Sequence, residues 1–314
     1  MPGERVDDRR ADVAVSVAKK RKVRGLGSER LREALVGYGF IALPMSFFLL
    51  FFIFPIGYAV YISFYDWGIL GKIEPVGLDN YRLLLDDELF RRALKNVAYY
   101  TVVVVPSQMA LGLFLAVIVN NALRFRAFFR AAYYFPALAS SAAITAIAIY
   151  LLSADGLVNQ VLGTDQPWLG DSDTALESIM ALNIWTTSGT IMLFYLAALQ
   201  SIPTDVYEAA AIDGAKNWRT FWKITFPLLR PAHFFVLVLS VIGCLKVFDQ
   251  AYIVSGGSGG PNYSTLTPVL YLYQVAIQEV DFGYAAALGV ALFLVIFTAT
   301  LLQRLLFGKP EVAG

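Results

Sequence analysis

Apolar residues in this chain are gathered in long blocks, and the length of a block separates a buried core helix from a membrane span. Six blocks hold little or no charge, at residues 36–64, 97–119, 131–152, 179–199, 232–254 and 284–302. Each has about the 20 residues that an α-helix needs to cross a bilayer. The pattern therefore predicts an all-α integral membrane protein with six transmembrane helices.

Four prolines lie inside these spans or near their ends: Pro44, Pro55, Pro106 and Pro136. Membrane helices tolerate proline because neighbouring helices or water bond to the carbonyls that it frees. Two interpretations stay open, namely kinked helices around a transport pathway and ordinary packing of membrane helices.

The composition agrees with a membrane protein and removes several other classes. The 314 residues are 58% hydrophobic and only 16% charged, whereas soluble domains are about 25% charged. The formal net charge of +1 gives no overall basic field for nucleic acid. Because Cys244 is the single cysteine and His233 the single histidine, we expect no intrachain disulfide, no metal site and no histidine-based catalytic triad.

The distribution of lysine and arginine predicts the orientation of the spans, because positive residues in short loops stay on the cytoplasmic side. Residues 1–35 hold ten of them, loop 120–130 holds three without any acid, and loop 200–231 holds four. Loops 153–178 and 255–283 hold none. We therefore expect both termini to lie in the cytoplasm.

Three segments outside the spans have distinct patterns. Residues 1–33 form a basic tail without the apolar core of a signal peptide; we expect it to be disordered and either to touch anionic lipid or to act only as a solvated orientation signal. Residues 309–314 form a second cytoplasmic tail. Segment 66–96 has apolar residues at helical spacing among charges, which predicts an amphipathic helix on the outer surface; they are Tyr81, Leu84, Leu85, Leu89, Phe90 and Leu94.

The cytoplasmic loop 201–231 has the signals of two short helices. Thr204 is placed to cap a helix that carries Glu208 near its positive end. Gly214 is expected to end that helix, because glycine tolerates the left-handed conformation of a C-terminal cap. A second helix with several aromatic residues follows, and we expect Pro227 to stop it. Exposed apolar surface in this loop predicts contact with a partner.

This loop resembles the EAA loop of the permease subunits of binding-protein-dependent ABC importers. The match comprises Glu208-Ala209-Ala210, Asp213-Gly214-Ala215, Ile224, Pro227 and Pro231. The resemblance implies the type I transmembrane-domain fold of these importers and coupling helices that dock in a cleft of an ATPase subunit. It implies that the residues that couple to the ATPase are Glu208, Ala209, Ala210, Asp213 and Gly214. The alternative is that these residues only shape a loop between helices.

Three further segments resemble carbohydrate importers, and in particular the maltose-type first permease. Residues 77–81 resemble the external signature that follows the first core helix of sugar permeases, and residues 248–261 and 282–287 resemble the last two helices of the maltose-type protein. The similarity covers about residues 36–306. Residues 255–261 form a slightly longer stretch than the family has, which leaves the geometry of that loop open.

Polar groups at membrane depth are the candidates for a substrate path, because an unpaired one costs a few kcal/mol and tends to face a cavity or a partner helix. Lys246 and Asp249 either form an ion pair or line the path. A second cluster lies on the span before the EAA loop, where maltose-type permeases contact sugar; its threonines alternatively bond only to neighbouring helices. The candidate residues are Asn183, Thr187, Thr190, Lys246 and Asp249, with Thr186 beside them.

These observations predict a permease subunit, not an enzyme, that imports a carbohydrate by alternating access. The sequence has no Gly-x-x-x-x-Gly-Lys-Ser/Thr phosphate loop, so we expect ATP and Mg²⁺ to bind to partner ATPases and no cofactor to bind to this chain. The resemblance implies a bacterial inner membrane location and, as partners, a second related permease, two ATPase subunits and an external solute-binding protein. Glycerol phosphate or another solute stays open as the cargo, and a secondary transporter or a membrane enzyme stays an alternative class.

Overall fold

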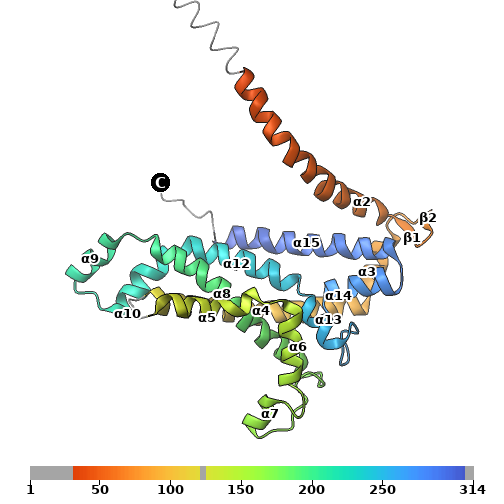
Figure 1. Ribbon diagram of the computed structural model, residues 1–314. Coiled ribbons are helices and arrows are strands. Elements are labelled where there is room, and N and C mark those ends of the chain that lie inside the picture. Colours follow the sequence, from red (N-terminus) through yellow and green to blue (C-terminus); the bar gives the residue numbers. More distant parts are fainter. Residues whose placement is uncertain (1–30, 121–124, 308–314) are drawn as a thin grey trace, which may run out of the picture. The chain divides into compact units, whose positions relative to one another are not determined.

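The computed structural model describes residues 31–120 and 125–307 (Figure 1). Residues 1–30 of the expected N-terminal tail and the whole of the expected tail 309–314 lie outside the described residues, whereas residues 31–33 already belong to the first helix. The chain divides into two units between Ala59 and Val60, and each is described separately.

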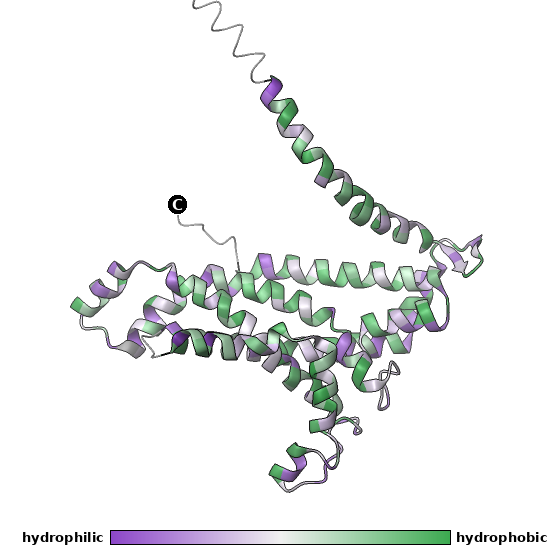
Figure 2. Cartoon of the chain, viewed as in Figure 1, coloured by the Kyte–Doolittle hydropathy of each residue, from purple (hydrophilic) through white to green (hydrophobic). Residues whose placement is uncertain are grey.

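The six predicted spans correspond to five long helices and one bent pair within the described residues. The long helices are Leu31–Ile62, α4 (Glu88–Asn120), α8 (Ala175–Gln200), Arg230–Ser255, which is interrupted near its C-terminal end, and α15 (Phe282–Phe307). Figure 2 shows α15 apolar along most of its length. The segment predicted as a span at 131–152 is not straight, because α5 (Arg126–Leu138) and α6 (Ser141–Leu151) meet at 92°. The chain turns at Ala139, whose backbone is extended.

The first unit contains the helix from Leu31 to Ala59, which includes a π-helical turn at Leu49–Ile53 and the start of α2 (Phe54–Ile62). Its large apolar side chains are exposed on all sides. Aromatic rings stack one turn apart, with 5.8 Å between the ring centroids of Phe47 and Phe51. A helix that is apolar all round is typical of a membrane span.

In the second unit, α8 packs against α4 and α5, and α12 (Arg230–Leu245) packs against α4, α8 and α15. Two glycines set the approach distances. A β-carbon at Gly112 of α4 would collide with Ile191 of α8, and one at Gly189 of α8 would collide with the Tyr133 carbonyl of α5. Small residues let membrane helices approach closely in this way. The backbone of α8 is therefore fixed tightly between two neighbours.

The amphipathic helix predicted within segment 66–96 is confirmed only in part: residues 79–86 form a short amphipathic helix, but it does not continue unbroken and residues 65–75 are not helical. The structure has an antiparallel hairpin, β1 (Tyr65–Gly68) and β2 (Gly71–Pro75), and then a short helix, α3 (Asp79–Asp86). Gly71 adopts a positive φ of 86° at the turn of the hairpin. The apolar residues that suggested one helix are shared between α3 and α4, because Asp87 ends the first and begins the second.

Asp87 joins three helices at this end of the bundle. One carboxylate oxygen accepts hydrogen bonds from the backbone N–H groups of Leu89 and Phe90, at 2.8 and 3.0 Å, and so caps α4. The other accepts from the hydroxyls of Tyr271 in α14 (Pro268–Tyr273) and Tyr284 in α15, at 2.6 and 2.5 Å. Burial opposes the charge, but these four hydrogen bonds hold the pKa of Asp87 below its ordinary value.

The EAA segment lies at the opposite end of the bundle from α3 and α14 (Figure 1). It contains α9 (Thr204–Ile212), α10 (Asn217–Thr220), a π-helical turn (Phe221–Thr225) and α11 (Phe226–Leu228). Two expectations are corrected here. Thr204 is the first residue of α9 and its side chain makes no capping bond; the cap position is Pro203. Pro227 does not stop the second helix, because the π-helical turn at Phe221–Thr225 runs directly into α11 and the helix continues past Pro227 to Leu228.

The remaining short elements fill the other loops. They are α7 (Leu157–Leu162), α13 (Asp249–Ser255), which packs against α6, and a π-helical turn (Gln274–Gln278). The span predicted at 232–254 is thus divided at Lys246–Phe248, between α12 and α13.

We expect Asp87→Asn to lower the free energy of unfolding by about 1.5–3 kcal/mol near neutral pH, because hydrogen bonds to a charged group are lost. Since the folded-state pKa is depressed, this stabilisation is complete above the unfolded-state pKa of about 3.9 and is lost as the pH falls through the lower folded-state value.

Unfolding of the detergent-solubilised protein, measured from pH 7 down to pH 3, checks this. The difference between the native chain and Asp87→Asn should shrink at the acid end. Asp86→Asn is the matched control, since the Asp86 side chain is exposed. A difference that stays constant over the whole range would contradict the role given to the carboxylate.

Candidate functional site

The larger polar cavity lies between α4, α8 and α12 and has a volume of about 450 Å³. This volume is within the roughly 300–1,000 Å³ typical of ligand sites. Three of the predicted substrate-path residues, Asn183, Thr187 and Thr190, line it together. The other described lining residues, none of them charged, are Gln108, Ile191, Phe194, Leu239, Ser240, Gly243 and Cys244. Amides, hydroxyls and one aromatic ring suit a neutral, hydroxyl-rich ligand.

Gln108 is a member of this site that the sequence reasoning missed. Its side chain is 3% exposed, and its Oε1 accepts a hydrogen bond from Thr187 Oγ1 at 2.7 Å. The Thr187 hydroxyl also lies 2.6 Å from the carbonyl of Asn183. Since a hydroxyl has one proton, it donates to only one of the two acceptors at a time. A lone glutamine in an apolar span was the signal available in the sequence.

Three polar side chains of the larger cavity have no protein partner among the described residues. The Asn183 amide and the hydroxyls of Thr190 and Ser240 make no hydrogen bond there, whereas Thr186 donates to the Asn183 carbonyl and Thr187 donates either to that carbonyl or to Gln108. A polar group without a partner at this depth is costly unless something in the cavity bonds to it. Asn183, Thr190 and Ser240 are therefore the groups available to a ligand.

A smaller polar cavity of about 200 Å³ lies at the bend between α5 and α6. It is enclosed by the end of α5, the first turns of α6, the threonine face of α8 and the start of α13. The polar residues that line it are Ser141, Thr145, Thr186, Thr187, Thr190 and Gln250. Because Thr187 and Thr190 also line the larger cavity, the two polar cavities adjoin along one face of α8.

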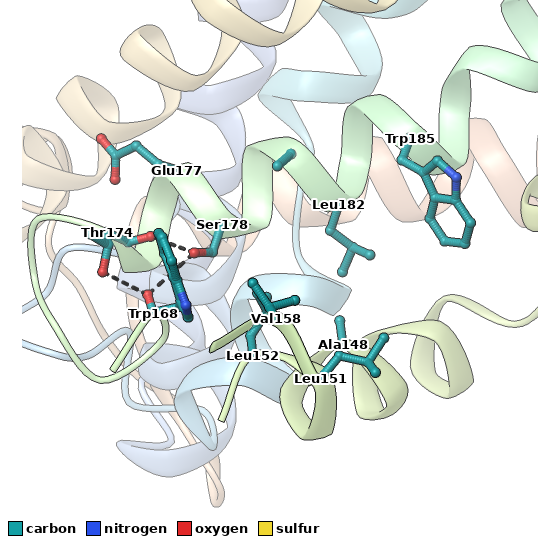
Figure 3. A pocket seen from close by; sticks show the side chains of 11 residues that line it. Ala148, Leu151, Leu152, Val158, Trp168, Thr174, Glu177, Ser178, Leu182 and Trp185 are labelled. Atoms are coloured by element: carbon teal, nitrogen blue, oxygen red, sulfur yellow. Dashed lines mark hydrogen bonds between the residues drawn. The ribbon is translucent and has the colours of Figure 1, made fainter. Parts of the chain in front are cut away.

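A third cavity, of about 520 Å³, is almost wholly apolar (Figure 3). It lies between α6, α7 and the N-terminal half of α8, with Leu151, Val158 and Leu182 among its walls. The loop beside it is held by polar contacts, since the carbonyl of Trp168 accepts hydrogen bonds from Thr174 and Ser178. This cavity suits an apolar group rather than a sugar hydroxyl.

The other two predicted substrate-path residues do not join this site. Lys246 and Asp249 are both exposed, and neither lines either polar cavity. They do not form the ion pair that their spacing allowed, because the one salt bridge among the described residues joins Arg82 and Asp79. The physical reason is the break in the helix: Lys246 caps α12 and Asp249 starts α13, so the two are not on one helical face.

The predicted coupling residues lie on and just after α9. Glu208, Ala209 and Asp213 are exposed, whereas Ala210 is buried. Gly214 has a φ of 72°, so it makes the left-handed turn that the sequence predicted. Beside them, Ile212 is 86% exposed and Trp218 is 74% exposed. This end of the bundle therefore presents large apolar side chains next to acidic ones.

A nearly continuous helical path connects this surface to the larger cavity. The N–H of Leu229 bonds to the carbonyl of Thr225, and the N–H of His233 bonds to the carbonyl of Leu229, so the backbone ladder bridges the junction between α11 and α12. The His233 Nε2 donates to the carbonyl of Phe226 at 3.2 Å. In the neutral ring, Nδ1 then accepts from the Tyr195 hydroxyl of α8, at 2.9 Å. His233 braces three elements and has no catalytic partner here.

Comparison with known proteins identifies the family. The model of the binding-protein-dependent transport system inner membrane component matches residues 108–310. The chain belongs to this family. It is a permease, a multi-pass inner membrane component of a transporter rather than an enzyme.

Curated relatives cover most of the permease. A probable ABC transporter permease protein, YesP of Bacillus subtilis (strain 168), is 35% identical over 278 residues, which are 86% of this chain and 90% of the relative. The lactose transport system permease protein LacF of Rhizobium radiobacter is 34% identical over 85% of this chain and 92% of its own. The arabinooligosaccharides transport system permease protein AraP of Bacillus subtilis (strain 168) is 34% identical, with 88% and 90% covered.

Solved structures share the fold of the permease. A chain of a bacterial alginate ABC transporter, solved in complex with its alginate pentasaccharide-bound periplasmic protein, has a TM-score of 0.79 at 23% identity, and covers 91% of this chain and 98% of its own. A second crystal structure of an alginate importer gives a TM-score of 0.76 at 22% identity, with 90% and 98% covered. The expected ABC importer permease fold is thus confirmed.

The hydrogen-bonding difference between two threonines of the permease gives a test of the site. We expect Thr187→Val to lower the free energy of unfolding by about 1–3 kcal/mol, because buried Gln108 loses its partner. Thr190→Val removes a hydroxyl with no protein partner and should change that free energy by less than about 0.5 kcal/mol. Unfolding in detergent measures both, and equal losses in the two variants would contradict this description of the cavity.

Proposed function

We propose that this permease imports a neutral carbohydrate by alternating access. The observation that carries the proposal is the 450 Å³ cavity, in which the free amide of Asn183 and the free hydroxyl of Thr190 lie near the ring of Phe194. Hydroxyl-rich ligands bond to amides and hydroxyls, and an aromatic ring covers their apolar faces. Relatives named for lactose and arabinooligosaccharide transport support the same class of cargo.

The charges of the site favour a neutral cargo over a phosphorylated one. No described residue that lines either polar cavity carries a charge. A phosphate group would favour arginine or lysine among the lining residues, and Lys246 lies outside both cavities. Glycerol phosphate is therefore the second candidate and is included in the test below.

Coupling to ATP hydrolysis is assigned to the surface around α9. Glu208 and Asp213 offer acidic groups to a basic partner, and the small Ala209 permits close approach. The exposed Ile212 and Trp218 supply the apolar area that a docking contact buries. We assign the cleft of an ATPase subunit as the partner of this surface.

The complete importer on this proposal has four membrane-associated parts and one external part. A second related permease pairs with this chain, two ATPase subunits bind ATP and Mg²⁺, and an external solute-binding protein delivers the cargo. The family's name supports the binding protein. The excess of lysine and arginine in residues 1–35 and in loop 200–231 supports cytoplasmic termini and a cytoplasmic α9.

The coupling assignment predicts that Glu208→Lys lowers co-purification of the ATPase subunits by about tenfold or more, because like charges at an interface cost several kcal/mol. Gly214→Val should do the same, since a β-branched residue resists the left-handed conformation. The permease should stay in the membrane in both cases.

Two controls separate docking from folding. Gly214→Asn keeps the left-handed turn available and should retain the ATPase. Asp155→Lys reverses an exposed charge in the loop before α7 and should have no effect. Unchanged co-purification of the Glu208→Lys complex would count against the coupling surface.

The cargo assignment is tested with the reconstituted complex and its binding protein. ATPase activity is titrated with mono-, di- and oligosaccharides and with glycerol phosphates. We expect stimulation by a neutral saccharide, and a loss of uptake without loss of assembly in Asn183→Ala. Stimulation by a phosphorylated ligand alone would refute the neutral cargo.

A further inference from the structure

The tip of the β1–β2 hairpin consists of two large aliphatic residues. Gly68 pairs with Gly71, so Ile69 and Leu70 form a two-residue turn between the strands. Within the part of the chain that the structure describes, their side chains are 77% and 98% exposed. Turns of this length usually carry glycine, asparagine or aspartate, which favour the backbone conformation required. Isoleucine and leucine do not favour it, so their presence at the tip indicates a contact outside the described residues.

The base of the hairpin is fixed to two helices. A β-carbon at Gly283, in the first turn of α15, would collide with the carbonyl of Tyr65 in β1. The side-chain amide of Asn80, in α3, donates to the carbonyls of Ser63 and Tyr65, at 2.9 and 3.2 Å. The hydroxyls of Ser63 and Tyr81 lie 2.6 Å apart. A contact made at the tip therefore acts on the ends of both α3 and α15.

The hairpin lies at a membrane boundary. It begins shortly after Ile62, the last residue of the first long apolar helix, and it packs against the first turn of α15, another span. Figure 1 shows it at the end of the bundle opposite to α9. The four residues of β1 extend about 13 Å, at about 3.3 Å per residue. The tip is therefore close enough to the boundary to reach the acyl chains, which monotopic segments enter by about 5–10 Å.

Aromatic rings and a lysine form the base of the hairpin. The ring centroids of Tyr61 and Tyr65 are 4.8 Å apart, and those of Tyr65 and Trp67 are 6.5 Å apart. The Lys72 Nζ lies 3.9 Å from the centre of the Tyr65 ring. Tyrosine and tryptophan gather where membrane and water meet, and lysine covers apolar surface while its ammonium stays in water. From base to tip, the hairpin thus changes from amphipathic to aliphatic, as a bilayer does from headgroup to acyl chain.

The chemistry of the tip favours lipid over a protein partner. Its two side chains are purely aliphatic, whereas the residues that dominate protein interfaces are mainly tryptophan, tyrosine and arginine, and leucine is under-represented. The charged residues of the two strands are Asp66, Lys72 and Glu74. They give the hairpin no excess of positive charge, so attraction to anionic headgroups does not explain a contact with lipid.

We propose that the hairpin is a membrane anchor. Ile69 and Leu70 insert among the acyl chains of the leaflet at this end of the bundle, and the aromatic base with Lys72 lies among the headgroups of zwitterionic phospholipid. In the proposed orientation this is the external leaflet. Through its bonds to α3 and its contact with α15, the anchor fixes the depth of both helices in the bilayer. The inference goes beyond the proposed function, because it holds for any cargo.

Spin labels on the assembled complex test the insertion. In a Cys244→Ala background, Leu70→Cys places a label at the tip, and Glu74→Cys, which is also exposed, places the matched control at the base. Collisions with oxygen, which concentrates in lipid, and with a water-soluble nickel chelate are measured in phosphatidylcholine bilayers. At Leu70→Cys we expect more oxygen collisions than at Glu74→Cys. Nickel collisions should be lower there by about fivefold or more, because acyl chains exclude a polar chelate.

Three results would overturn the anchor, and none of them bears on carbohydrate import. Few collisions with either reagent at Leu70→Cys would mean that protein covers the tip. Nickel collisions that fall only when the solute-binding protein is added would assign the tip to that partner. Nickel collisions that fall only when phosphatidylglycerol is mixed into the bilayer would replace apolar insertion by electrostatic attachment.

Hydrogen exchange gives a second readout without a label. In the double variant Ile69→Ser with Leu70→Ser, we expect the protection factors of the amides in residues 65–75 to fall by about tenfold in the same bilayers, the effect of losing one large apolar contact. Serine is the better turn former, so the turn itself would give the opposite change. Val161→Ser, on α7 and 76% exposed, is the control and should leave these amides unchanged. Unchanged protection in the double variant would refute the anchor.

Discussion

A polar group inside a bilayer has no water to bond to, and the arrangement around α8 follows from that constraint. Most hydroxyls on this helix satisfy it internally, as Thr186 does on the carbonyl of Asn183. Gln108 satisfies it by reaching across from α4 to Thr187. The groups that remain, on Asn183 and Thr190 of this helix and on Ser240 of α12, face the larger cavity. The division between structural and ligand-binding polar groups can therefore be read from which hydrogen bonds the protein makes for itself.

This division requires α8 to keep a fixed position, and close contacts at two glycines, Gly112 and Gly189, hold it there. At Gly112 the backbone of α4 receives the side chain of Ile191 from α8, and at Gly189 the backbones of α8 and α5 meet directly. Association of helices in lipid depends on such close packing, since lipid tails are as apolar as the side chains they would replace. At the far end, Asp87 supplies a different kind of fixation, because one carboxylate serves α4, α14 and α15 together.

Much of this architecture could be predicted from the sequence, because the spans depend on long blocks of apolar residues. The turn at Gly214 was predictable too, since it depends on one residue type. The failures share a different cause. The hairpin after Ile62 and the separation of Lys246 from Asp249 depend on where the backbone stops being helical. The helical spacing of apolar residues does not predict where a helix ends. Asp87 was the available signal for the separate break between α3 and α4, as a good helix cap within an apparently periodic segment.

The candidate site was predicted in part for the same reason. Asn183, Thr187 and Thr190 share one helix, so their common face follows from periodicity. Gln108, Ser141 and Gln250 come from α4, α6 and α13, and only the packing of those elements brings them together. The resemblance to maltose-type permeases located the helix but not its neighbours.

The nearly continuous helical run from α10 to α12 has a mechanical consequence. Backbone hydrogen bonds at Leu229 and His233, and the two side-chain hydrogen bonds of His233, connect the aromatic end of this run to α12. A tilt of the aromatic end therefore displaces Ser240 and Gly243, which form part of the wall of the larger cavity. A rigid helix transmits such a movement in both directions. Filling of the larger cavity should then move the exposed aromatic residues at the α10 end as directly as a contact made there moves the wall of the cavity.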